Sequence, residues 1–171
     1  MRRSIHSRVA VFCLVAVVIA GIAACATAPR LRGDEVSLPL SEFFVRPVGP
    51  RGQEPTQTLL GLNGKRVLVQ GFMVREEEPF PGLFMLAALP VSIAERADGP
   101  ADYLPPATLF VHLPDAQRDE IVKYVPARLE LAGTLELGAK EEASGRVSYV
   151  RLRLDDLEDA RTAEVGTQPN P

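Results

Sequence analysis

Cysteine and histidine are scarce in this chain of 171 residues, which contains two of each. Cys13, Cys25 and His6 all lie near the N-terminus, so His112 is the one histidine of the rest of the sequence. A single copy therefore cannot assemble, beyond residue 25, a zinc site of the usual His and Cys ligands or a Cys-His nucleophilic pair. We expect no structural disulfide, no metal and no cofactor.

An apolar run long enough to cross a bilayer is also missing. The run at residues 9–22 is about 14 residues long, whereas a membrane-spanning helix needs roughly 20. Arginines at positions 2, 3 and 8 precede it, and the small residues Ala23 and Ala24 close it. This layout is typical of a secretory signal peptide. The sequence predicts such a peptide over residues 1–24 and makes a transmembrane anchor the weaker interpretation.

The four residues Ile22-Ala23-Ala24-Cys25 resemble the bacterial lipobox. The resemblance implies that Cys25 is lipidated on its sulfur and becomes the first residue after cleavage. Two or three acyl chains would then hold the protein on membrane lipid. The neutral Ala26 that follows implies sorting to the periplasmic face of the outer membrane. A plain secreted protein, cleaved after a small residue, is the alternative.

The chain also lacks an excess of positive charge. Without residues 1–24 the chain keeps 147 residues, with 16 basic and 22 acidic side chains and a net charge of −6. A surface that follows a nucleic-acid backbone is normally basic, so nucleic acid is not an expected partner. The remaining length suits one domain with a real core and flexible ends.

Proline, glycine and polar residues mark the two ends of that domain. Residues 25–58 are expected to form a lipidated, flexible tether, because residues 46–58 are rich in Pro and Gly and read as a linker or a long surface loop. Within the tether, residues 36–45 are apolar and could dock as a short strand or as a helical turn that begins at Ser41. Residues 158–171 are polar, so we expect a disordered tail. The folded domain is assigned to residues 59–157.

Five strand-like runs follow one another in that domain, at residues 65–75, 83–89, 108–113, 127–137 and 147–154. The last two alternate apolar and polar residues, which predicts strands with one buried face. Gly71 interrupts the first run, as glycine does at a barrel corner. Residues 115–124 predict one short helix between the third and fourth strands. The fold class is therefore all-β, a small five-stranded Greek-key barrel of the OB type.

The chain contains three short motifs, Leu62-Asn63-Gly64-Lys65-Arg66-Val67, Gly71-Phe72-Met73 and Phe84-Met85-Leu86. Together they resemble the DUF3299 family, small periplasmic bacterial proteins of unknown function with OB-like barrels. The resemblance spans residues 59–113 and implies the barrel fold and an envelope location. Family members often carry a cysteine in a proline-rich stretch after the second strand, where this chain has Asp102-Tyr103-Leu104-Pro105-Pro106 and no cysteine, so a metal or redox role is not carried over.

Candidate chemistry is sparse. His112 is interpreted as a half-buried strand histidine with a backbone or carboxylate partner rather than as a lone base or pH sensor. Two acidic clusters, at residues 76–78 and 155–159, lack the spaced oxygen ligands of a cation loop. They are interpreted as a solvated loop and a hydrated strand end.

The long connection at residues 90–106 is the stronger candidate, because long ordered loops tend to carry function. Two interpretations stay open: a rigid apolar edge for a ligand or partner, or a plug of core residues in the barrel mouth. The candidate residues are Phe80, Leu83, Tyr103, Leu104, Pro105 and Pro106.

The sequence therefore favours a lipid-anchored envelope accessory or docking protein without catalytic activity, with an envelope protein as its partner. The alternative is a binder of envelope glycan or a small ligand through the barrel face and the 90–106 loop, favoured by exposed aromatic rings on the second and third strands. A hydrolase with two facing carboxylates is the least favoured class.

Overall fold

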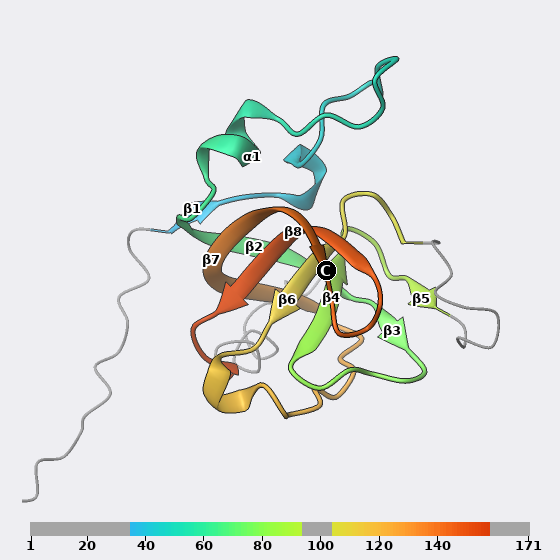
Figure 1. The fold of residues 1–171 in the computed structure, drawn as a ribbon, viewed down its shortest axis with the longest axis vertical. Coiled ribbons are helices and arrows are strands. Elements are labelled where there is room, and N and C mark those ends of the chain that lie inside the picture. The colour runs from blue at the N-terminus through green and yellow to red at the C-terminus, as the bar shows by residue number, and fades with distance from the viewer. Residues whose placement is uncertain (1–34, 94–103, 158–171) are drawn as a thin grey trace, which may run out of the picture. The chain divides into compact units, whose positions relative to one another are not determined.

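The computed structural model describes residues 35–93 and 104–157 (Figure 1). The predicted signal peptide, Cys25, part of the 90–106 loop and the predicted tail lie outside these residues. The elements in chain order are β1 (Val36–Ser37), η1 (Leu40–Glu42), α1 (Gln57–Gly61), β2 (Arg66–Met73), β3 (Arg75–Glu76), β4 (Leu83–Ala87), β5 (Ser92–Ile93), β6 (Leu109–His112), η3 (Asp115–Gln117), β7 (Arg128–Glu141) and β8 (Val147–Leu154), where η marks a 3-10 helix.

Five strands close into a barrel in the order β2-β4-β6-β8-β7, and β7 pairs back onto β2 (Figure 1). Strands β6 and β8 run parallel, whereas the other neighbouring pairs in this ring are antiparallel. Closing the ring removes the free strand edges of an open sheet. The predicted all-β Greek-key barrel is therefore confirmed.

Strand β2 pairs with β7 along most of its length and with β4 at its end. It pairs with β7 from Arg66 to Phe72 and with β4 at Phe72 and Met73. A Cβ atom on Gly71 would come 2.9 Å from Leu40 Cδ1 and 3.0 Å from the Ala87 carbonyl oxygen. The close approach of these two residues explains the glycine.

The alternation predicted for the last two strands places their leucines in one core. Leu131 and Leu135 of β7 and Leu152 of β8 are fully buried and belong to the same apolar cluster as Val67 and Phe84. The interior of the barrel is thus filled by side chains. Ligand space must lie outside it.

Residues 36–58 are not a flexible tether, which corrects the sequence expectation. Strand β1 pairs in parallel with β2, and the side chains of Leu38, Leu40 and Phe43 are part of the main core. The Pro- and Gly-rich stretch is a surface hairpin held by the hydrogen bond from Val45 N to the Glu54 carbonyl at 2.8 Å. The domain therefore begins before residue 38, and Figure 1 shows this segment lying across one side of the barrel.

An ion-pair cluster joins the start of that segment to the end of the barrel. The guanidinium of Arg66 donates from Nε to Glu35 Oε1 at 2.7 Å, and its Nη1 pairs with Asp155. The Glu35 side chain is only 7% exposed. Asp155 is therefore bonded to a barrel strand, in contrast to the hydrated strand end expected for this acidic cluster.

The predicted helix at residues 115–124 is reduced to the three-residue 3-10 helix η3. The Glu120 carbonyl, which an α-helix would use internally, accepts a hydrogen bond from Gly82 N at 2.8 Å. Ile121 and Tyr124 are exposed, and Val122 is partly buried against the core. A short helix with so little packing is marginal in water, and the contact with Gly82, just before β4, prevails.

Strand β7 continues four residues beyond its predicted end at Leu137. A register shift between Leu137 and Lys140 marks a bulge, after which Lys140 pairs with Ser148 and Glu141 with Val147. Gly138 occupies the bulge with φ near 117°, a conformation that residues with a Cβ rarely adopt. The turn is shortened to residues 142–146, and the hairpin projects beyond the barrel.

Gly133 offers a test of this packing. Gly133 lies in β7 opposite Leu154 of the paired strand β8. A Cβ atom there would come 2.4 Å from the Arg153 carbonyl oxygen. We expect Gly133→Ala to lower the free energy of unfolding by about 1–3 kcal/mol, because a backbone atom cannot move aside cheaply.

Urea denaturation measures this change. Gly61→Ala is the control, because nothing lies within 4 Å of its added Cβ atom, and it should leave stability unchanged or slightly raised. Equal stability of Gly133→Ala and the unsubstituted protein would contradict the β7–β8 geometry.

Candidate binding site

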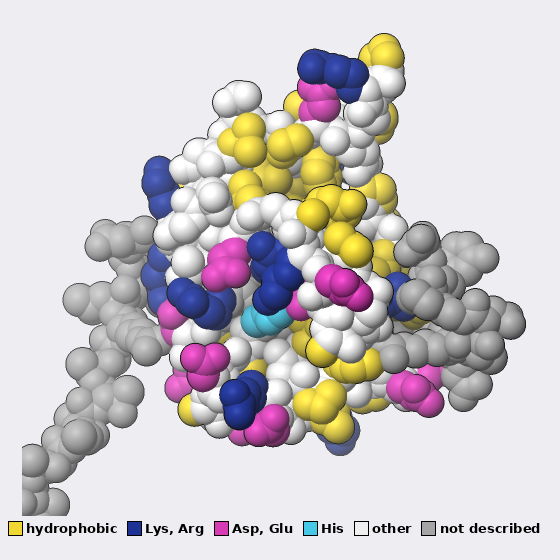
Figure 2. Space-filling model, in the orientation of Figure 1, with side chains coloured by type: hydrophobic (Ala, Val, Ile, Leu, Met, Phe, Trp, Pro, Cys, Tyr) yellow, Lys and Arg dark blue, Asp and Glu magenta, His cyan; other side chains and the backbone are white. Residues whose placement is uncertain are grey.

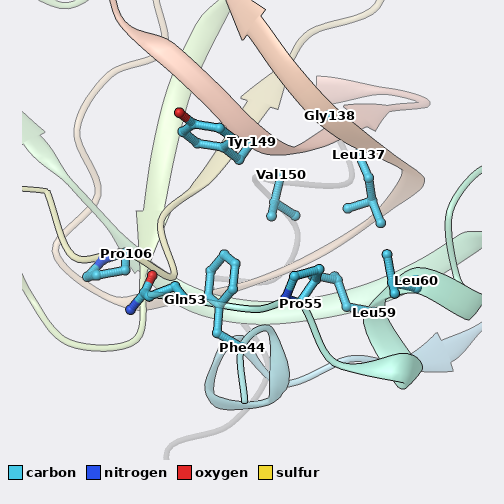
Figure 3. Close-up of a pocket in the computed structure, with 10 residues that line it drawn as sticks. All are labelled: Phe44, Gln53, Pro55, Leu59, Leu60, Pro106, Leu137, Gly138, Tyr149 and Val150. Atoms are coloured by element: carbon cyan, nitrogen blue, oxygen red, sulfur yellow. The ribbon is translucent and has the colours of Figure 1, made fainter. Parts of the chain in front are cut away.

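A pocket of about 750 Å³ lies between the N-terminal segment and the β7–β8 hairpin (Figure 3). Its volume falls within the range of roughly 300–1,000 Å³ typical of small-molecule sites. Most of the lining side chains are apolar, and no acidic residue is among them. The lining residues are Phe44, Gln53, Pro55, Leu59, Leu60, Pro106, Leu137, Gly138, Tyr149 and Val150.

Helix α1 is fixed beside the pocket by Thr56. The Thr56 hydroxyl accepts a hydrogen bond from Leu59 N at 3.1 Å, which caps the helix, and donates to the Glu42 carbonyl at 2.6 Å. The cap thus ties α1 to η1. As a result Leu59 is buried in the core, while Leu60 remains 45% exposed at the pocket.

Phe44 stands near the middle of this site. In Figure 3 its ring lies between Gln53 and Pro55 and points toward Val150. It also contacts the buried ring of Phe43 edge to face, with centroids 6.5 Å apart. The ring is therefore held from below by the core and presents its other side to the pocket.

A second pocket of about 450 Å³ shares Phe44, Gln53 and Pro106 with the first. Residues 45–48 of the surface hairpin form part of its wall, together with Leu89 and Pro105. We refer to the two pockets together as the apolar groove. Arg46 is the single charged residue among those that line them, all of which belong to the described part of the chain.

Large apolar side chains are exposed around the groove. Tyr149 is 62% and Leu89 is 72% exposed, and Val45 and Val48 are about half exposed. Figure 2 shows hydrophobic side chains gathered on this part of the surface, above a group of charged side chains of both signs that surround the histidine. Contiguous exposed apolar surface of this kind marks interaction sites.

The neighbouring polar cluster connects the β7–β8 hairpin to β6. The Ser148 hydroxyl donates to Glu142 Oε1, and the same oxygen lies 3.2 Å from His112 Nε2. Arg151 Nη1 donates to Ser148 Oγ at 3.0 Å and to the Gly138 carbonyl at 2.7 Å. Since Gly138 also lines the pocket, the cluster holds one wall of the groove in place.

The order of groups in this cluster matters for its chemistry. In a serine nucleophile site the imidazole accepts the proton of the hydroxyl, whereas here the Glu142 carboxylate lies between Ser148 and His112. The arrangement gives the buried Glu142 carboxylate its hydrogen-bond partners and does not activate the Ser148 hydroxyl as a nucleophile. The carboxylate partner expected for a half-buried His112 is confirmed.

The residues proposed from sequence do not form one surface. Phe80 and Leu104 pack on a small second core in which Leu83 and Phe110 are buried, on the outer face of the barrel. The short strands β3 and β5 flank this core, and β5 lies within the connection expected to be a loop.

Of the remaining proposed residues, Pro105 and Pro106 line the groove. Tyr103 and Cys25 lie outside the described residues. Within the 90–106 connection, Leu104 thus packs on the core, whereas Pro105 and Pro106 line the groove.

The exposed aromatic rings that would favour a glycan ligand are not found on β4 and β6. Their aromatic rings, Phe84 and Phe110, are both buried. Glu77 and Glu78 are exposed, in agreement with a solvated loop. Within residues 35–93 and 104–157, no three His, Cys, Asp or Glu side chains gather as metal ligands.

Sequence reasoning missed the residues that build most of the groove, namely Phe44, Gln53, Leu60 and Tyr149. Phe44 and Gln53 fall within the segment expected to be a tether, and Tyr149 falls within a predicted strand. The apolar pair Leu59-Leu60, soon after a Pro-rich segment, was the available sequence signal. It could not be used without knowing that the segment folds back on the barrel.

No protein-family model and no curated protein matches this chain. Among solved structures it is similar to a DUF3299 family protein from Pseudomonas aeruginosa PAO1, with 14% sequence identity and a TM-score of 0.42. The match covers 72% of this chain and 95% of that one. The family resemblance expected from the sequence is confirmed as a loose one, and it identifies neither a ligand nor an activity.

The polar cluster can be tested through Ser148. Its side chain is fully buried and bonded to both Glu142 and Arg151. We expect Ser148→Ala to lower the free energy of unfolding by about 1–3 kcal/mol, because two buried charged groups each lose a partner. Thermal and urea unfolding check this result.

Ser92→Ala is the matched control, because Ser92 is an exposed strand residue. Its substitution should change stability by less than about 0.5 kcal/mol. If the two variants were equally stable, the cluster would contribute nothing to holding the hairpin.

Proposed function

We propose that this chain is a lipid-anchored accessory protein of the bacterial cell envelope that binds an apolar group in the groove and performs no catalysis itself. The observation that carries the proposal is the 750 Å³ pocket, walled by the N-terminal segment on one side and the β7–β8 hairpin on the other. The anchor is Cys25, and the location is the periplasmic face of the outer membrane. The partner is an envelope protein or a ligand found there.

The lining of the groove supports binding over chemistry. Gln53 and Tyr149 are the two side chains of the larger pocket that carry hydrogen-bonding groups. A few polar groups in an apolar pocket orient a ligand, but neither of these residues is a general acid or base at neutral pH. Beside His112, the Glu142 carboxylate is already bonded to the imidazole and to the Ser148 hydroxyl.

The N-terminal sequence supports the anchor. The apolar run is too short to span a membrane, and no helix among the described residues is long and apolar enough to do so. The described residues, 35–93 and 104–157, belong to one compact unit. A lipid on Cys25 would therefore attach it to the membrane through a short stretch of chain.

The anchor is tested by expressing the full chain and Cys25→Ala in bacteria and fractionating the cells. We expect acyl mass on Cys25 and recovery in the outer membrane for the unsubstituted protein. The Cys25→Ala protein should lack the acyl mass and leave the outer membrane fraction. An unmodified, freely soluble protein with Cys25 intact would refute the anchor.

The groove is tested with the neutral apolar dye Nile red and full-length protein carrying Cys25→Ala, which has no acyl chains of its own to compete. Leu60→Glu should weaken dye binding about tenfold or more, because it places a charge at an apolar pocket. Leu60 is half exposed, so the substitution should not unfold the domain.

Thr58→Glu adds the same charge to the exposed side of α1 and serves as the control. It should leave dye affinity unchanged. Equal affinity for all three proteins, each shown to be folded by circular dichroism, would refute the groove as the binding site.

A further inference from the structure

We propose that the apolar groove is a site for an anionic amphiphile, with a long acyl chain in the two pockets and its anionic head beside Arg46. This inference rests on the proposed function, because it names the class of ligand for the same groove. Three observations carry it: the continuity of the pockets, the poverty of hydrogen-bonding groups in their walls, and the position of Arg46.

The two pockets are adjacent parts of one surface. Phe44, Gln53 and Pro106 line both of them, so a ligand in one pocket touches residues of the other. The pockets measure about 750 and 450 Å³, and most of the side chains that line each of them are apolar. A long unbranched chain can pass from one to the other, whereas a compact ligand would fill only the first.

The walls suit a chain without polar groups. A bound peptide carries an amide at every residue, and a buried amide without a partner costs free energy. In the larger pocket the side-chain partners are Gln53 and Tyr149, and the Gly138 carbonyl already accepts from Arg151. An acyl chain needs no such partners and gains free energy with each methylene buried.

Arg46 supplies the charge preference. It lines the smaller pocket, and among the described residues it makes no ion pair, in contrast to the nearby Arg51, which lies 2.8 Å from Glu54. No acidic residue lines either pocket. A guanidinium without a carboxylate partner, at the edge of an apolar groove, fits the carboxylate or phosphate head of an amphiphile.

The experiment is isothermal titration calorimetry of full-length Cys25→Ala protein with fatty acids of increasing chain length, each below its micelle concentration. We expect affinity to rise about fourfold per added methylene until the groove is filled. A fatty alcohol of equal length should bind about two- to fivefold more weakly than the acid, because it lacks the charge.

Two substitutions test separately where the anionic head and the acyl chain of the ligand bind. Arg46→Gln should abolish the difference between acid and alcohol, while Leu60→Glu should weaken both. Arg118→Gln removes the same charge from an exposed position outside both pockets and should preserve the preference for the acid. An alkyl phosphate that binds more tightly than the acid of equal length would indicate a lipid headgroup as the natural source, and the reverse order a free fatty acid.

Two results would overturn the inference. Affinity independent of chain length would exclude an acyl site, and an acid–alcohol difference that persists in Arg46→Gln would exclude Arg46 as its basis. If Nile red binding still responds to Leu60→Glu in either case, the proposed function survives and a partner's apolar side chains become the better occupant. Loss of both responses would refute the two proposals together.

Discussion

The pairing of β2 with β7 is the constraint on which the rest of the structure depends. Seven consecutive residues of β2 pair with β7, and this ladder converts a chain of antiparallel and parallel pairs into a closed barrel. Because the ring closes over a core of leucines, the interior offers no room for a ligand. Any site must be built on the outside, from elements that the barrel strands themselves do not need.

The N-terminal segment and the β7–β8 hairpin are these additional elements. The segment docks through β1, Leu38 and Phe43, and the hairpin extends past the barrel because Gly138 allows the ladder to resume after a bulge. Without the other, the N-terminal segment and the hairpin would each leave apolar side chains exposed. The groove forms where they face each other, and the Arg151, Ser148, Glu142 and His112 cluster holds the hairpin wall in place.

The sequence predicted the parts of the fold that depend on local patterns. Alternation identified β7 and β8, because strand periodicity is a property of neighbouring residues. The docking of Phe43 and the reduction of the helix after Pro114 depend on partners far along the chain, Leu59 and Gly82 among them. The site was missed for the same reason, since Phe44 and Tyr149 meet only after the barrel closes.

The cluster of Arg66 with Glu35 and Asp155 has a mechanical consequence. Any force on the chain from its N-terminal side reaches the domain at Glu35 and the two-residue strand β1, before it reaches the pocket wall. Arg66 lies on β2, so the load passes directly into the long β2–β7 ladder. A pull on the chain at Glu35 would thus be transmitted to the β2–β7 ladder, and not first to the residues that line the groove.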